Sequence, residues 1–263
     1  MGLSSSLKQD VIELLISVIL EKLERYSAES SHMPFHYRLL GKDRMALFSF
    51  IHSLNTTFGT SIFEPVAALI AKERFADVRL HVKPFDQINE QAEQEVQNLM
   101  RELISAKSSP NKEEELRRLS HCIKASSGKA KLKKVKLTAV DIWLRGASGE
   151  IYLIDLKTAK PNRGEFQRIK RTLLEWAATE MTRDPEAKVY TMIGIPYNPY
   201  DPEPYHRWTL RGLLDLNQEV LVAEELWDFL GGEGTYPDLL NCFEQAGIRL
   251  RPQLDAYFAR FRD

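Results

Sequence analysis

Residues 137–158 read LTAVDIWLRGASGEIYLIDLKT, which is two short apolar runs separated by a turn rich in glycine and serine. Both runs are rich in β-branched and aromatic residues and are too short for typical helices. The intervening segment, 145–149, has the length of a hairpin loop. We therefore expect a β-hairpin here.

Charged side chains interrupt both predicted strands. Asp141 lies within the first run, Asp155 comes near the end of the second, and Lys157 follows two residues later. Charges inside such strands are costly unless they have partners. Because side chains at i and i+2 share one face of a strand, Asp155 and Lys157 should project together. If Asp141 faces the same side, two carboxylates and an ammonium converge, which is the outline of a magnesium-dependent phosphodiesterase site. An Asp–Lys ion pair with a purely structural role is the alternative.

The chemistry of phosphodiester hydrolysis explains this combination. Mg²⁺ takes oxygen ligands, usually one or two carboxylates with waters and substrate phosphate. Asp141 and Asp155 would supply the carboxylates, and the carbonyl of Leu156 a neutral ligand. Lys157 would orient or help deprotonate the attacking water and stabilise charge on the phosphate. The pattern acid-x-Lys recurs at Glu186-Ala187-Lys188, which we expect to be a solvated helix-to-strand junction. The hypothesis therefore rests on the position of Asp155 and Lys157 at the end of a predicted strand, not on the acid-x-Lys pattern alone.

The hairpin resembles the PD-(D/E)XK nuclease superfamily, in which the first acid lies on one strand and the (D/E)-x-K on the next. Within it, three strings resemble a subgroup of type II restriction endonucleases: IDLKTAKPN at 154–162, IPYNPY at 195–200 and YHRW at 205–208. The resemblance covers residues 137–208 well and the N-terminal helices loosely. One departure is Val140, where the superfamily name has proline.

The resemblance implies a Mg²⁺-dependent enzyme that cuts double-stranded DNA and leaves 5′-phosphates. It further implies a homodimer that reads a short GC-rich palindrome such as GGNCC, alongside a cognate methyltransferase. A repair nuclease or junction resolvase of the same superfamily is the second interpretation. A non-catalytic DNA-binding protein with a nuclease fold is the third. Plasmid digestion separates them, because restriction gives discrete bands.

Further site residues are expected on either side of the hairpin. The resemblance draws attention to Glu64 as a metal ligand carried by a helix. Since Pro65 suits a first-turn position, Glu64 could equally be an acid favoured by the helix dipole. Phosphate or base contacts are expected from basic and amide side chains, although a charge run is often only a solvated face. We expect the loop tyrosines to brace the fold, and DNA reading by this loop is the alternative. These DNA-binding candidates are Lys134, Lys136, Lys160, Asn162, Arg163, Arg168, Asn198, His206 and Arg207.

Periodicity predicts the remaining elements. Helices are expected over 7–26, 44–54, 61–75 (starting at Ser61 or Ile62), 86–107, 111–123, 165–182, 222–231 and 236–262, and strands over 77–84 and 189–195. A helix between the hairpin and the strand at 189–195 implies a right-handed parallel crossover, and hence a mixed sheet. We expect an α/β fold: a restriction-endonuclease-like mixed sheet flanked by helices, with a helical N-terminal part. One domain, 1–263, would comprise N-terminal helices (about 1–123), a catalytic core (about 124–208) and C-terminal helices (about 209–263).

Composition sets outer limits. The 263 residues carry 36 Lys+Arg and 37 Asp+Glu, a net charge of −1, which excludes a histone-like protein but not a nucleic-acid enzyme. Cys122 and Cys242 are far apart in sequence, which favours a reducing compartment and opposes a structural zinc site. No apolar run approaches the roughly 20 residues of a membrane span. We therefore expect a cytoplasmic protein.

Overall fold

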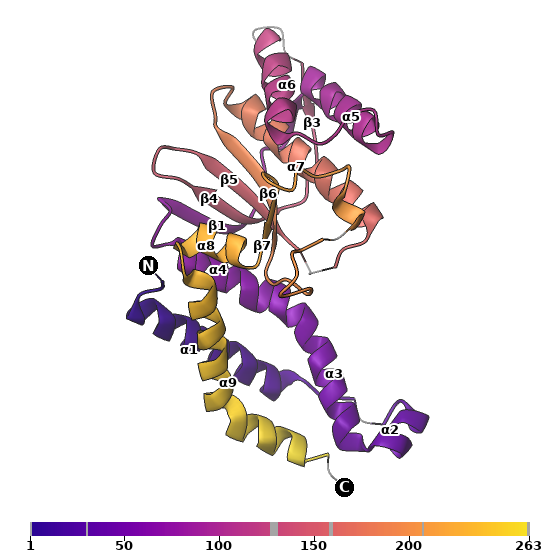
Figure 1. Ribbon diagram of the computed structural model, residues 1–263, viewed down its shortest axis with the longest axis vertical. Helices are drawn as coiled ribbons and strands as arrows, with labels where there is room; N and C mark the ends of the chain where they lie inside the picture. Colours follow the sequence, from indigo (N-terminus) through magenta and orange to yellow (C-terminus); the bar gives the residue numbers. More distant parts are fainter. Residues whose placement is uncertain (1, 30, 127–130, 158–159, 207, 262–263) are drawn as a thin grey trace. The chain divides into compact units, whose positions relative to one another are not determined.

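A computed structural model describes residues 2–29, 31–126, 131–157, 160–206 and 208–261 (Figure 1). The chain divides into two compact units, one of residues 1–70 with 231–263 and the other of residues 71–230. The division into a single nuclease domain with three parts stays a prediction. In the described ranges, no helix combines the length and the apolar character that crossing a membrane requires.

The unit of residues 71–230 is built on a five-stranded sheet with the order β1-β4-β5-β6-β7. Its strands are β1 (Asp77–Val82), β4 (Val140–Arg145), β5 (Ile151–Leu156), β6 (Val189–Ile195) and β7 (Val220–Val222). β4 pairs antiparallel with both β1 and β5, whereas β6 pairs parallel with β5 and β7. The predicted hairpin, the parallel crossover and the mixed α/β sheet are confirmed.

The crossover helix α7 (Arg163–Arg183) covers one face of the sheet. It begins where Asn162 accepts a hydrogen bond from the backbone N–H of Glu165. Its buried positions Phe166, Ile169, Leu173 and Leu174, predicted from helical spacing, share a core with Leu153 of β5. Asp155 has the same strand parity as Leu153, so the acid lies at the edge of the face that α7 covers.

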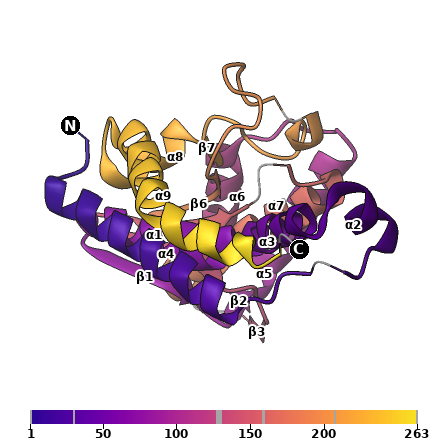
Figure 2. The same cartoon turned by 90° about the horizontal axis from the view of Figure 1, so that it is seen from below.

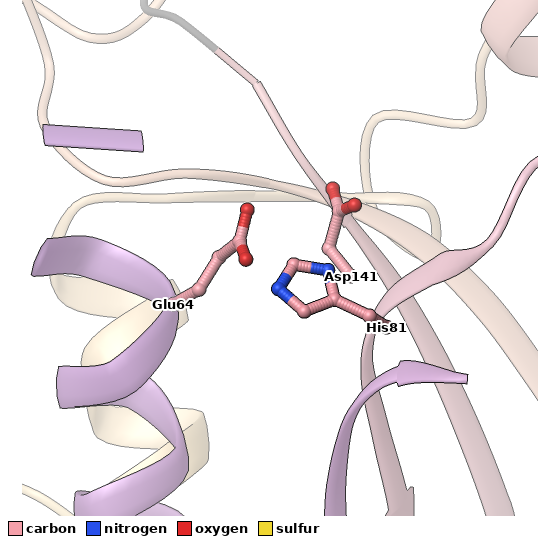
Figure 3. Close-up of side chains that lie close together, drawn as sticks. All are labelled: Glu64, His81 and Asp141. Atoms are coloured by element: carbon pink, nitrogen blue, oxygen red, sulfur yellow. The ribbon is translucent and has the colours of Figure 1, made fainter. Parts of the chain in front are cut away.

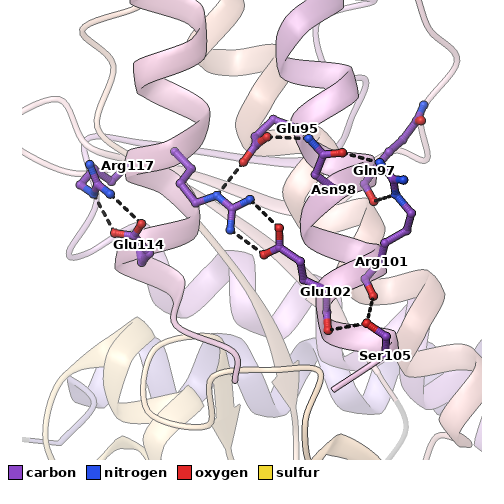
Figure 4. A network of polar contacts seen from close by, with 9 residues as sticks. Glu95, Gln97, Asn98, Arg101, Glu102, Ser105, Glu114 and Arg117 are labelled. Carbon is purple, nitrogen blue, oxygen red and sulfur yellow. Dashed lines mark hydrogen bonds and ion pairs between the residues drawn. The ribbon is translucent and has the colours of Figure 1, made fainter. Parts of the chain in front are cut away.

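Helices α5 (Glu90–Ile104) and α6 (Lys112–Ala125) pack side by side. Arg118 of α6 donates to Glu95 and to both carboxylate oxygens of Glu102 on α5 (Figure 4). The expected helix over 86–107 was wrong at its start. Residues Gln87–Asn89 form β2, which pairs with β3 (Leu132–Lys134), and Asn89 then caps α5 by accepting from the N–H groups of Gln91 and Ala92.

The unit of residues 1–70 with 231–263 is helical, as expected for the N-terminal part. It contains α1 (Ser5–Arg25), α2 (Pro34–Leu40), α3 (Lys42–Thr57), a π-helical turn (Phe58–Phe63), the start of α4 (Glu64–Ala71) and α9 (Thr235–Ala259); α8 (Glu224–Gly231) precedes α9. Helices α1 and α9 pack along each other (Figure 2). The expected helix over 61–75 was wrong at both ends, because residues 61–63 are π-helical and α4 ends at Ala71.

Candidate active site

Asp141 and Asp155 stand opposite each other on neighbouring strands. The register of the hairpin pairs Ile142 with Ile154 and Trp143 with Leu153, so the next positions along it are Asp141 and Asp155. Residues directly opposite in an antiparallel pair project to the same face. The expectation that the two acids face one side of the sheet therefore agrees with the strand register.

Hydrogen bonds hold the predicted residues of the hairpin together. The Lys157 Nζ donates to Asp155 Oδ1 at 2.6 Å and to the carbonyl oxygen of Leu156 at 3.2 Å. The backbone N–H of Leu156 donates to Asp141 Oδ2 at 2.8 Å. The ammonium thus contacts two of the oxygen donors predicted to bind a cation. The catalytic and ligand roles of these four residues stay predictions.

The electrostatics of this group fit a hard divalent cation. Burial, together with the neighbouring Asp141, raises the pKa of Asp155 to about 6, although Lys157 acts in the opposite direction. Asp155 is 5% exposed, so the protein holds a carboxyl group beside a second carboxyl group with little water to screen them. A divalent cation bound by carboxylates and a carbonyl would relieve this repulsion, and these donors are those that Mg²⁺ takes.

His81, which the sequence analysis did not select, lies beside Asp141 (Figure 3). A ring nitrogen of His81 and a carboxylate oxygen of Asp141 lie within 4.8 Å of each other. The residue sits in β1, a strand predicted only from weak alternation, and its φ of 53° could not be anticipated. A single histidine with no motif around it gives no signal in the sequence. Pairing of β1 with β4 is what brings it to the acids.

Glu64 lies in the first turn of α4, and its side chain is buried. It belongs to residues 1–70, whereas the hairpin belongs to residues 71–230. Its role as a metal ligand stays a prediction.

Four of the predicted DNA-binding residues are basic and have exposed side chains. Arg163 and Arg168 are exposed on the first turns of α7, and Lys136 is exposed before β4. Lys134 is exposed on β3, with its Nζ 3.8 Å from Asp86. These side chains are accessible, and DNA contact by any of them stays a prediction. The predicted contact Arg207 lies outside the described residues.

The loop after β6 is braced by its own side chains. The Asn198 amide donates to the carbonyl of Glu203 and accepts from the N–H of Tyr200. The rings of Tyr205 and His206 pack against Tyr200, and the Lys160 Nζ lies 5.2 Å from the centre of that ring. This agrees with the expectation that loop tyrosines brace the fold. It gives Asn198 a structural task beside its predicted role.

The second acid-x-Lys tripeptide, Glu186-Ala187-Lys188, lies between a helix and a strand, as expected. Glu186 follows α7 before β6, its side chain is 81% exposed, and it pairs with Lys124. The Ile151 N–H of β5 donates to the carbonyl of Lys188, but the side chains of Glu186 and Lys188 are exposed. The solvated junction predicted for Glu186-Ala187-Lys188 is confirmed.

Comparisons with known proteins agree with one another. The family model of the type II restriction endonuclease HinfI matches residues 3–247. The type II restriction enzyme MjaII of Methanocaldococcus jannaschii is 30% identical over 261 residues, covering 86% of this chain and 67% of that enzyme. The type II restriction enzymes HgiCII and HgiEI of Herpetosiphon aurantiacus are each 24% identical, covering 86% of this chain and 81% of those enzymes.

Proposed function

The chain belongs to the HinfI family of type II restriction endonucleases, and from this premise we propose that it hydrolyses double-stranded DNA at one short sequence. The reaction depends on Mg²⁺ and leaves 5′-phosphates. The observation that carries the proposal is the grouping of Asp141, Asp155 and Lys157 at one edge of the β4–β5 hairpin. These residues would supply the two acids and the lysine that the proposed reaction needs.

Asp141, Asp155 and the Leu156 carbonyl would hold the cation, with Glu64 as a further predicted ligand. When bound, the cation acts as a Lewis acid toward the phosphate and as a template for the attacking water. The Leu156 N–H fixes the Asp141 carboxylate through its hydrogen bond, so this ligand is oriented in advance. Preorganised groups of this kind need no rearrangement as charge develops on the phosphate.

Lys157 has the second task in the proposed reaction. Its ammonium is anchored on Asp155 and is only 18% exposed, so it presents a poorly screened positive charge. From this position it would orient the attacking water and stabilise the nonbridging oxygens of the phosphate. A neutral side chain of the same length would leave the water without this donor and the phosphate without this charge.

Binding of the duplex would rest on the exposed basic groups that flank the hairpin. Lys136 precedes β4, and Lys160, Arg163 and Arg168 follow β5. We also propose that two copies of the chain read a palindrome, because twofold protein symmetry then matches twofold site symmetry. A short GC-rich site such as GGNCC, a protecting methyltransferase and a cytoplasmic location complete the proposal.

Digestion of plasmid DNA tests it. With Mg²⁺ the purified chain should give discrete bands, and sequencing of the fragment ends should give one site and one cut position. The ends should ligate without kinase treatment, since they carry 5′-phosphates. Lys157→Ala should lower cleavage about a hundredfold or more, the loss typical of one charge-stabilising donor.

Lys188→Ala is the matched control, because Lys188 is the exposed lysine that ends the second acid-x-Lys tripeptide, Glu186-Ala187-Lys188. It should cut at the wild-type rate. Smears, cutting confined to branched DNA, or full activity of Lys157→Ala would each contradict the proposal.

A further inference from the structure

His81 has no task in the reaction as proposed above, yet its position on β1 places it against the predicted ligands. The β1–β4 register pairs Leu80 with Ile142 and Val82 with Val140, so His81 stands opposite Asp141. Because Asp155 stands opposite Asp141 on the other side, His81, Asp141 and Asp155 form one row across three strands. The row ends on an imidazole.

The backbone at His81 supports a specific role for its side chain. Its φ of 53° lies in the left-handed region, which residues other than glycine rarely adopt. Such conformations cost roughly 1–3 kcal/mol and concentrate at functional sites. At His81 the result is an exposed imidazole beside Asp141, with the strand resuming its pairing at Val82.

The separation of the donor atoms suits one ion. Ligand nitrogens and oxygens lie about 2 Å from a small divalent cation, so two donors on one ion are at most about 4 Å apart. A ring nitrogen of His81 and an oxygen of Asp141 lie within 4.8 Å of each other before any cation binds. This separation is close to the roughly 4 Å that two donors on one small ion can span.

We propose that His81 adds a nitrogen donor to the cation site at Asp141, so that the site takes later first-row transition ions such as Co²⁺ and Ni²⁺ as well as Mg²⁺. The inference rests on the proposed function, because it extends the ligand set of the same site. Imidazole favours the later first-row ions, whereas a set of carboxylates and a carbonyl suits Mg²⁺. The imidazole therefore raises the preference of the site for later first-row ions relative to Mg²⁺.

Affinity measurements on the full chain without DNA test the proposal. His81→Asn removes the imidazole, and asparagine tolerates positive φ better than most residues. Calorimetric titration should show the Kd for Co²⁺ rising at least about tenfold, the loss expected even for an outer-shell partner of a ligand. The Kd for Mg²⁺ should stay within about twofold, since the oxygen donors remain. His121→Asn, an exposed histidine on α6, is the matched control and should change neither.

A spectroscopic readout identifies the donor directly. Electron spin echo modulation of the Mn²⁺-loaded wild type should contain the coupling of a directly bound imidazole nitrogen. That coupling should disappear in His81→Asn and persist in His121→Asn. Its absence from the wild type, or an equal loss of Co²⁺ and Mg²⁺ affinity in His81→Asn, would overturn the inference.

The two proposals fail separately. If the wild type cuts one site with Mg²⁺ but carries no nitrogen coupling, the role of His81 is wrong and the proposed function stands. If the wild type binds Mn²⁺ through nitrogen but cuts no DNA, the ligand role stands and the proposed function is wrong.

Discussion

Asp155 carries a buried charge that is costly for the stability of the fold, and we propose that it serves the reaction. Asp155 is 5% exposed, and burial together with Asp141 on the neighbouring strand raises the pKa of its carboxyl group to about 6. Lys157 offsets only part of this penalty. At neutral pH the folded chain therefore holds a carboxylate that the unfolded chain would solvate freely.

Replacing this charge should separate stability from activity. We expect Asp155→Asn to abolish Mg²⁺-dependent cleavage and to raise the free energy of unfolding in EDTA at pH 7.5 by about 1–3 kcal/mol, the size of a buried-group desolvation penalty. The amide oxygen can still accept from Lys157. Urea unfolding and plasmid digestion measure the two effects. Asp86→Asn, at an exposed position, should alter neither, and a less stable Asp155→Asn would contradict the argument.

At the level of single residues, sequence predicts neighbours along a strand better than neighbours across strands. Two-residue spacing predicted that Asp155 and Lys157 share a face, and they are in contact. Asp141 could be placed on the same face only conditionally, because that depends on the hairpin register. The position of His81 could not be predicted from the sequence. Its place opposite Asp141 follows from pairing between segments 60 residues apart and from a φ of 53°.

A buried ionic network joins α6, α7 and the segment before β7. The Lys170 Nζ contacts Glu115 at 2.5 Å and Glu219 at 2.6 Å, while the Lys112 Nζ donates to Glu219 at 2.8 Å and to the hydroxyl of Thr191 at 2.7 Å. All four charged residues are at most 3% exposed. Burial raises the pKa of Glu115, although Lys170 acts in the opposite direction. The network thus depends on every charge having its partner.

Removal of Lys170 should show this dependence. We expect Lys170→Met to lower the free energy of unfolding by roughly 3–5 kcal/mol at pH 8, because it leaves buried carboxylates without their cation. Without Lys170 the pKa of Glu115 rises further, so the folded variant keeps a proton that the unfolded chain releases. Its stability should therefore fall as pH rises above the usual glutamate range, and the loss should be smaller at pH 5.

Urea unfolding of the wild type and variant at pH 5 and pH 8 measures both quantities. Lys188→Met is the control, since Lys188 is exposed, and it should be neutral. A loss that is the same at both pH values would contradict the role given to Glu115.

Helices and strands were predicted well where the apolar pattern was long, and short elements were missed. The strand expected over 189–195 has these bounds in the structure, because its run of apolar residues is almost unbroken. Helix α7 was expected within two residues at each end. The three-residue strands β2, β3 and β7 were missed, since three residues carry no period. Helix α2 was missed as well, because it has seven residues and no buried face.

Helix α2 exposes apolar side chains that packing within a single chain does not explain. In residues 34–40, all of which the structure describes, no side chain is buried. Phe35 is 85% exposed and Leu39 is 82% exposed, one helical turn apart. Helices shorter than about 12 residues are marginal in water without packing. Exposed apolar side chains continue along α3 at Leu47, Phe48 and Ile51, and clusters of this kind mark interaction surfaces.

The proposed homodimer would use this surface, and we expect α2 of each copy to pack against the other. Phe35→Ser with Leu39→Ser should convert the dimer to a monomer in sedimentation velocity, because the anchors of a small interface dominate its affinity. A monomer carries one active site, so plasmid cleavage should shift from double-strand cuts to nicks. Leu240→Ser with Ile248→Ser, at exposed apolar positions of α9, is the matched control and should remain dimeric. If the α2 variant stays dimeric, or if the wild type sediments as a monomer on and off its DNA site, the dimer contact expected for α2 is wrong.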